Sequence, residues 1–561
     1  MIVAIAGLLL AAAVCAFSLL VGRKAQQGLQ RSRYQSMIQY GLETQLIQDK
    51  NDLHRFGLSQ LLRRTSGGLS VVGMSMNTMA IIGGGALLFG PALEAGGPSV
   101  IGIGLPIVAL LSICVSASLA ELVSGVPTAG GIYHVAYQLG GRKWGIRAGW
   151  LHLAGYLAKL ALFIGGFAFL VDSLLASRFG YDSTVLTFCA AAGAGAFTQA
   201  ALCHYGQSIA NKVQAAGVWL QIVIILSAIV GLVWMFWPGD YSPVTMYQWL
   251  DSNLEQPVQP LMFVLGFLLL AQLFTGMDGA AHGAEETIEP RVRVPWAIYL
   301  STAYTYIALF VLLFFMTLIV MPAGGLMFVS PELFHASGLG GFVQYAAAGW
   351  GGSVWLKALI IVSLWQSGQQ TMTACSRAVF SLARDEALPF SRKLASLSFR
   401  RHTPLIAIWS VACAALLLLI GLGSLQTEGA FMPLIAAAIV CLHLAYAIPV
   451  GLSWLSDRSA SRAQHKRGTR PVEPGGNKSP WQLGEWSFPI RSAALAWLIL
   501  SAGLTAGIVH PFGGITAAAV TLALTATDFR YGSRRATGKK RRERQDRSET
   551  AATAENKIRQ Q

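Results

Sequence analysis

The stretch from Leu273 to Pro290 reads LFTGMDGAAHGAEETIEP, and it follows the apolar run LMFVLGFLLLAQ at Leu261–Gln272. That run has the composition of a membrane helix that has not yet reached its full length. Thr275-Gly276 interrupts it, although a glycine inside a helix costs about 1 kcal/mol relative to alanine. We therefore predict a break within a membrane span, with Asp278–Glu286 on a second half-helix.

The composition places the whole chain in a membrane. Its 561 residues are 54% hydrophobic and only 12% charged, with a mean hydropathy of +0.53. Soluble domains carry about 25% charged residues, and this chain has many apolar runs long enough to span a bilayer. We predict an all-α polytopic membrane protein.

The net charge of +15 does not indicate a nucleic-acid partner, because most of it lies in loops and in the C-terminal tail. The seven cysteines fall mostly in apolar segments and form no CxxC pair, so neither a disulfide framework nor a metal site is indicated.

Hydropathy predicts twelve core spans after one extra N-terminal span. The core spans lie at roughly 69–93, 98–123, 146–174, 184–203, 213–237, 259–282, 295–321, 353–380, 405–422, 430–455, 489–508 and 512–529. The predicted divisions are the extra helix (1–22), a basic linker (23–68), a first half with core helices one to five (69–237), a second half with helices six to ten (259–455), helices eleven and twelve (489–529) and a basic tail (530–561).

Lysine and arginine cluster in every second loop, which predicts that these loops and the C-terminus are cytoplasmic in the plasma (inner) membrane. Arg23 and Lys24 follow the first apolar run and no basic residue precedes it, which favours a retained helix with its N-terminus outside over a cleaved signal peptide. The basic tail either attracts anionic lipid or is a solvated topology anchor.

The first core span carries a second unusual run, IIGGGALLFGPALEAGGP at Ile81–Pro98. Three adjacent glycines, Gly83, Gly84 and Gly85, predict an unwound segment; the alternative is close helix packing. Paired interruptions in the first and sixth core helices are typical of an inverted-repeat transporter whose substrate binds at the breaks. Half-helix ends there can hold a carboxylate at their N–H groups and an ammonium or cation at their carbonyls.

Three stretches resemble the amino acid–polyamine–organocation transporter superfamily. They are ASLAELVSGVPTAGGIYHVAYQLGG (Ala117–Gly141), TGMDGAAHGAEETIEPRVRVPWAI (Thr275–Ile298) and SRAVFSLARDEALPFSRKLASLSFRRHTPLIAIW (Ser376–Trp409). The pattern Thr-Gly-x-Asp, then His, then Ala-Glu-Glu-Thr is most similar to the amino acid/choline branch, which includes 4-aminobutyrate and choline permeases. The resemblance runs from about residue 69 to 530.

The resemblance implies a leucine-transporter-like fold of five helices, an inverted five and two more. It also implies substrate contacts at Ile82, Gly83, Gly84 and Gly85 in the first helix and at Phe274, Thr275, Gly276 and Asp278 in the sixth. The first-helix motif lacks the Ser-Gly or Thr-Gly hydroxyl common in the superfamily, and the extra N-terminal helix has no counterpart in the common core.

Two lysines are candidate coupling groups. Lys159 lies in the predicted third core helix, where a lysine costs about 2.5–3.5 kcal/mol on insertion scales. In a functional role, this lysine would replace a coupling ion or would titrate during transport. In a structural role, it would pair with a neighbouring helix or extend its ammonium to the membrane surface. Lys212 begins the fifth span, a helix on which some proton-coupled members of the superfamily use a lysine. Its place near the cytoplasmic end of that span favours the alternative, an ordinary interfacial charge.

Asp278 either selects the substrate's amine or caps the second half-helix. His282, Glu285 and Glu286 lie further along and are expected to form a gate or an interhelical network rather than a metal site. No residue is predicted to be catalytic.

The predicted eighth helix carries hydroxyls at Ser363, Ser367 and Thr371, which could contribute to a sodium site or bond back to their own helix. The side chains of Tyr156 and Trp365 could cover an ammonium substrate through cation–π contact.

We expect a secondary active transporter of an amino acid, 4-aminobutyrate, choline or a polyamine-like amine, working by alternating access. H⁺ or Na⁺ is the expected coupling ion, and no cofactor is expected. The alternatives are a transport-inactive sensor on the same fold, a membrane-embedded enzyme and a channel. The sequence leaves the oligomeric state open.

Overall fold

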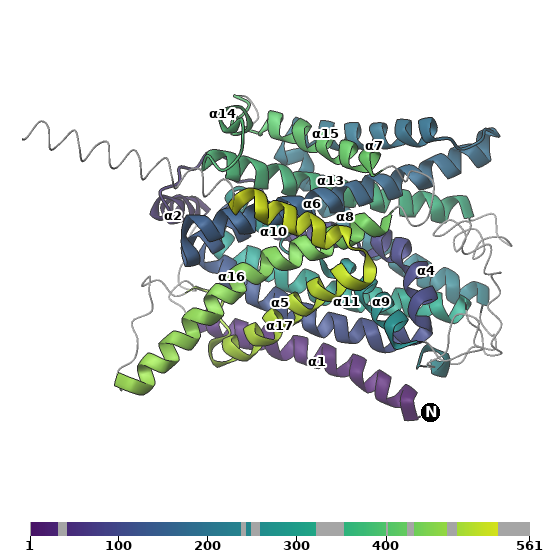
Figure 1. Ribbon diagram of the computed structural model, residues 1–561, viewed down its shortest axis with the longest axis horizontal. Coiled ribbons are helices and arrows are strands. Elements are labelled where there is room, and N and C mark those ends of the chain that lie inside the picture. The colour runs from purple at the N-terminus through teal and green to yellow at the C-terminus, as the bar shows by residue number, and fades with distance from the viewer. Residues whose placement is uncertain are drawn as a thin grey trace, which may run out of the picture.

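The computed structural model describes residues 2–31, 42–236, 243–247, 259–320, 353–399, 402–422, 431–467 and 479–525. These residues form helices that lie side by side in one bundle (Figure 1), and the part of the chain that is described contains an isolated bridge between Ser66 and Thr287 but no strand. The prediction of an all-α polytopic protein is confirmed.

Apart from the break region, the helices are α1 (Ile2–Arg31), α2 (Leu42–Arg55), α3 (Gly68–Met79), α4 (Ile81–Ser99), α5 (Leu105–Gly125), α6 (Ile132–Phe179), α7 (Val185–Tyr205), α8 (Gln207–Phe236), α11 (Pro290–Val320), α13 (Ser353–Arg384), α14 (Ser391–Leu394), α15 (Leu405–Gly421), α16 (Met432–Arg467), α17 (Ser487–Leu504) and an unlabelled helix at Phe512–Thr525.

Nine helical stretches of the described residues have the length and hydropathy to cross a membrane. One of them, Gly68–Gly125, contains the first two predicted core spans, which are joined by a tight bend at Gly97 with a φ of 64°. The described parts of the other predicted spans also lie on helices, apart from single residues at their ends and a non-helical segment at Thr275–Asp278 in the sixth.

The extra helix α1 packs along the outside of the bundle against α5 (Figure 1). The Tyr306 hydroxyl on α11 donates to the Ala11 carbonyl of α1 at 3.3 Å, and Tyr299 bonds to Ser18. The short helices α2 and α14 lie at one end of the bundle, at the left in Figure 1, which we call the α2 end.

The first helix break does not lie at the glycines, so that prediction is wrong. Gly83, Gly84 and Gly85 are helical within α4, and the break is at Ala80, whose φ and ψ are both 60°. A Cβ added to the three glycines would lie 2.8 Å from Leu364, 3.1 Å from Leu273 and 3.0 Å from Leu309, respectively. The glycines therefore allow close helix packing, which was the alternative.

The second break lies where it was predicted. Helix α9 (Pro260–Ala271) passes into a 3₁₀ turn and ends before Thr275, which is extended, and Gly276 has a φ of 78°. The half-helix beyond is shorter than predicted: α10 (Gly279–His282) is a single turn, and a 3₁₀ turn at Ala284–Glu286 follows.

The two breaks adjoin each other. A Cβ on Gly276 would lie 2.6 Å from the Thr78 side chain, two residues before Ala80. The Ala280 N–H donates to Ser75 Oγ at 3.0 Å. The first and sixth core helices are thus interrupted at one place inside the bundle.

Candidate substrate site at two helix breaks

One face of α6 supplies three polar side chains to the break in the sixth core helix. His152, Tyr156 and Lys159 follow one another at i, i+4 and i+7, a spacing that aligns side chains on one side of a helix. All three are buried.

Asp278 is the centre of the resulting network. Its Oδ2 lies 2.6 Å from His152 Nε2 and 3.3 Å from His282 Nε2. Its Oδ1 accepts hydrogen bonds from the hydroxyls of Tyr156, at 2.9 Å, and of Tyr446 on α16. The carboxylate thus joins α6, α16 and the half-helix α10.

The Asp278 side chain does not cap α10. The residue occupies the N-cap position, but its carboxylate makes no cap hydrogen bond and faces α6 and α16 instead. Of the two predicted roles, the capping role therefore does not match the geometry.

Lys159 holds the break itself. Its ammonium donates to the carbonyl oxygen of Thr275 and, at 2.8 Å, to the Thr275 hydroxyl. Its Nζ also lies 5.6 Å from the centre of the Phe163 ring. The lysine thus pairs with the backbone of a neighbouring helix at the point where that backbone is not helical.

His282, Glu285 and Glu286 connect the break to the α2 end. The His282 Nδ1 lies 3.3 Å from the Ala129 carbonyl. Glu285 pairs with Arg384 at 3.1 Å, and Glu286 pairs with Arg377 at 3.2 Å, both arginines being on α13. These contacts form an interhelical network of the predicted kind.

The α13 hydroxyls have two kinds of partner. Ser363 Oγ accepts a hydrogen bond from the Gly83 N–H at 3.2 Å, which joins α13 to α4 just after the first break. Ser367 and Thr371 donate to the carbonyls of Ser363 and Ser367, four residues earlier, as in the back-bonding alternative.

Two predicted site residues lie away from the breaks. The indole N–H of Trp365 donates to Thr198 on α7 at 2.9 Å, so its ring faces that helix. Lys212 is exposed on α8. Neither is retained as a site residue, since a helix directs only one of its faces toward the centre. Ile82 and Phe274 are buried beside the breaks.

Two members of the network, His152 and Tyr446, were not predicted. His152 could have been found, because it shares the spacing of Tyr156 and Lys159 on one helix face. Tyr446 comes from a helix nearly 170 residues further along the chain and carries no local signal.

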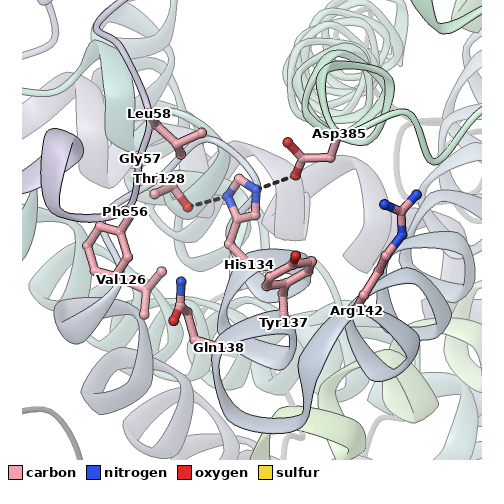
Figure 2. Close-up of a pocket in the computed structure, with 10 residues that line it drawn as sticks. All are labelled: Phe56, Gly57, Leu58, Val126, Thr128, His134, Tyr137, Gln138, Arg142 and Asp385. Atoms are coloured by element: carbon pink, nitrogen blue, oxygen red, sulfur yellow. Dashed lines mark hydrogen bonds and ion pairs between the residues drawn. The ribbon is translucent and has the colours of Figure 1, made fainter. Parts of the chain in front are cut away.

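A cavity of about 320 Å³ lies at the α2 end and contains none of the predicted substrate contacts. Figure 2 shows His134 at its centre, bonded to Thr128 and Asp385, with Arg142 and Phe56 on opposite sides.

A bundle of membrane-length helices, two of them broken around buried charged groups, defines a polytopic membrane transporter. The sequence profile of the amino acid permease family matches residues 67–521. The chain therefore belongs to the amino acid permease family.

Several relatives are similar over most of their length. Amino-acid permease BAT1 of Arabidopsis thaliana is 25% identical over 80% of this chain and 86% of its own. Amino-acid permease 2 of Neurospora crassa is 26% identical over 68% of this chain and 67% of its own. The thiamine transporter thi9 of Schizosaccharomyces pombe is 23% identical over 74% of this chain and 76% of its own. The chain is an integral membrane transporter of amino acids or amines.

Proposed function

We propose that this protein is a secondary active transporter of an amino acid and that the substrate binds between the two helix breaks. Alternating access would arise from movement of the broken helices against α6, α13 and α16. The observation that carries the proposal is the contact of the Lys159 ammonium with the Thr275 carbonyl in the second break.

The charges at the breaks favour a substrate with a carboxylate. Helix α4 begins at the first break with no side-chain cap from its own N-cap residue, Ala80, and among the described residues only Ser363 Oγ is seen to accept from its first turn, at Gly83. The N-terminal end of a helix attracts anions. Lys159 adds a positive charge, whereas Asp278 already accepts hydrogen bonds from two tyrosines and contacts two histidines. A purely cationic amine would therefore meet a like charge without a carboxylate free to pair with it.

The same contacts favour H⁺ over Na⁺ as the coupling ion. The Lys159 ammonium occupies oxygen atoms of Thr275 that could otherwise bind a cation, and the Ser367 and Thr371 hydroxyls are hydrogen-bonded within their own helix. The proposal also assigns the α2 end to the cytoplasm of the plasma membrane and the N-terminus to the outside, in accord with the distribution of basic loops.

Uptake by the full-length protein in proteoliposomes tests the proposal. We expect an imposed proton gradient, and not a sodium gradient, to drive uptake of at least one amino acid in a panel that includes 4-aminobutyrate. The methyl ester of that amino acid, choline and putrescine serve as carboxylate-free controls and should be transported at least about tenfold more slowly, the effect of losing about 1.4 kcal/mol of binding. Faster uptake of choline or putrescine than of any amino acid would overturn the carboxylate argument, and no gradient-driven uptake would favour the sensor alternative.

A further inference from the structure

Three nitrogen and oxygen atoms converge beside the second break in an arrangement that substrate binding does not require. They are His152 Nε2, His282 Nε2 and Asp278 Oδ2, and their three side chains are almost completely buried. We propose that they form a binding site for a divalent transition-metal ion of the Zn²⁺ class.

The distances fit such an ion. The carboxylate oxygen lies 2.6 Å from His152 Nε2 and 3.3 Å from His282 Nε2, and the two nitrogens are 3.4 Å apart. In tetrahedral coordination at about 2.05 Å, neighbouring ligand atoms lie about 3.3 Å apart. Two of the three separations already match, and the hydrogen-bonded pair of His152 and Asp278 would widen by about 0.7 Å.

The surroundings orient the three ligands. Because a carbonyl can only accept, His282 Nδ1 carries the proton of its bond to Ala129, which makes the Nε2 lone pair of the neutral ring available. The hydroxyls of Tyr156 and Tyr446 both donate to Asp278 Oδ1, so Oδ2 is the oxygen that faces the imidazoles. Such hydrogen bonds to the outer atoms of ligands are the usual support of a metal site.

The ligand set selects the class of ion. Two imidazoles and one carboxylate suit Zn²⁺, Co²⁺ or Ni²⁺, whereas Mg²⁺ and Ca²⁺ prefer oxygen ligands throughout. Three protein ligands leave a fourth tetrahedral position for water or for a donor atom of a bound ligand.

The ion would also restrain movement. His152 lies on α6, while Asp278 and His282 lie beyond the break in the sixth core helix, so one ion would join two elements. This consequence rests on the proposed function: if those elements move relative to each other during transport, micromolar Zn²⁺ should inhibit wild-type uptake and a chelator should restore it.

Co²⁺ binding to the purified full-length protein tests the site without any transport. We expect one Co²⁺ per chain, with the visible absorption bands typical of four-coordinate Co²⁺ and displacement by Zn²⁺. In His152→Gln and in His282→Gln, affinity should fall at least about a hundredfold, since loss of an outer hydrogen bond alone costs 10–100-fold. His204→Gln, at the end of α7 and outside the cluster, is the matched control and should bind like the wild type.

The outcomes separate the two proposals. Absence of saturable Co²⁺ binding to the wild type, or unchanged spectra in both cluster variants, would overturn the metal site while leaving amino acid transport intact. A Zn²⁺-dependent rise in the wild-type melting temperature that both variants lack would support the site even if uptake were never detected.

Discussion

At the scale of single residues, Lys159 is the group with the clearest electrostatic consequence. A completely buried ammonium must be compensated, and this one is held by the carbonyl and hydroxyl oxygens of Thr275. Thr275 follows the end of α9, where helix carbonyls carry partial negative charge. The lysine therefore stabilises the broken backbone and keeps a positive charge beside the proposed substrate.

Replacing Lys159 by methionine should reduce both binding and selectivity. The change removes the charge and leaves the Thr275 carbonyl without its donor, a loss of about 1–3 kcal/mol. We expect uptake of the preferred amino acid to fall about tenfold or more and its preference over the methyl ester to decrease. Lys212→Met, on the exposed side of α8, is the control and should retain both properties. An unchanged preference in the Lys159 variant would contradict a carboxylate contact.

The residues of this site differ in how far the sequence could predict them. Asp278 and Lys159 could be predicted because a charge inside an apolar run is itself a signal. Trp365 shows the limit of such reasoning, since a hydropathy profile locates its helix but does not say which face is turned toward α7. Tyr446 could not be predicted, because only the folded bundle brings α16 to the break.

At the scale of elements, the two breaks were not equally predictable. Gly276 occupies a left-handed conformation that favours glycine, so the glycine in the sequence predicts that break directly. Ala80 adopts a left-handed conformation without any such residue, and the surrounding packing imposes it. The glycines at 83–85, which suggested a break, instead allow neighbouring helices to pack closely. Helix positions, by contrast, followed from hydropathy alone.

The linker before the first core helix forms a latch at the α2 end. The N–H groups of Thr65 and Ser66 both donate to the Glu286 carbonyl at 2.9 Å. Asp49 on α2 accepts from the Glu289 N–H at 3.0 Å and lies 3.8 Å from Arg64. The linker is thus bound to the segment that continues the broken sixth helix.

Docking of this latch should depend on pH through Asp49. Burial raises the pKa of its carboxyl from 3.8 to about 6. The nearby Arg64 and the hydrogen bond from the Glu289 N–H oppose this increase, and the charges of Asp52 and Glu289 add smaller increases. Because the docked state binds the proton more tightly, docking is strongest at low pH and weakens as the pH rises through about 6. Hydrogen exchange of the α2 amides, corrected for the intrinsic rate, should show more protection at about pH 5 than at about pH 7.

Asp49→Asn supplies the control for this experiment. An amide can still accept from the Glu289 N–H but does not titrate, so protection of α2 should become nearly independent of pH. Equal protection of the wild type at both pH values, or greater protection at the higher one, would show that Asp49 does not control the latch.

At the scale of the whole molecule, ion pairs close the α2 end between the breaks and the surface. Glu285 is fully buried against Arg384, whose side chain is 14% exposed, and Glu286 is buried against Arg377. Both acids follow the half-helix α10, and both bases lie on α13. Separation of the sixth core helix from α13 at this end therefore requires both pairs to break. The proposed alternating access would have to open this closure.

Arg384→Ala should shift the protein toward states that are open at the α2 end. Loss of the arginine leaves the Glu285 carboxylate buried without its partner, which destabilises the closed arrangement by about 3–5 kcal/mol. Cys375 is buried on α13, two residues before Arg377, and should react several-fold faster with a maleimide in this variant, as measured by peptide mass spectrometry. In Arg384→Lys, which keeps the charge, Cys375 should react at a rate between those of Arg384→Ala and the wild type.

Cys441 on α16, which is buried in one cluster with Ala502, is the control for a general loosening of the fold and should react at the wild-type rate. Equal acceleration of both cysteines would mean that the pair supports the fold as a whole, and no acceleration of either would mean that it does not hold the α2 end closed.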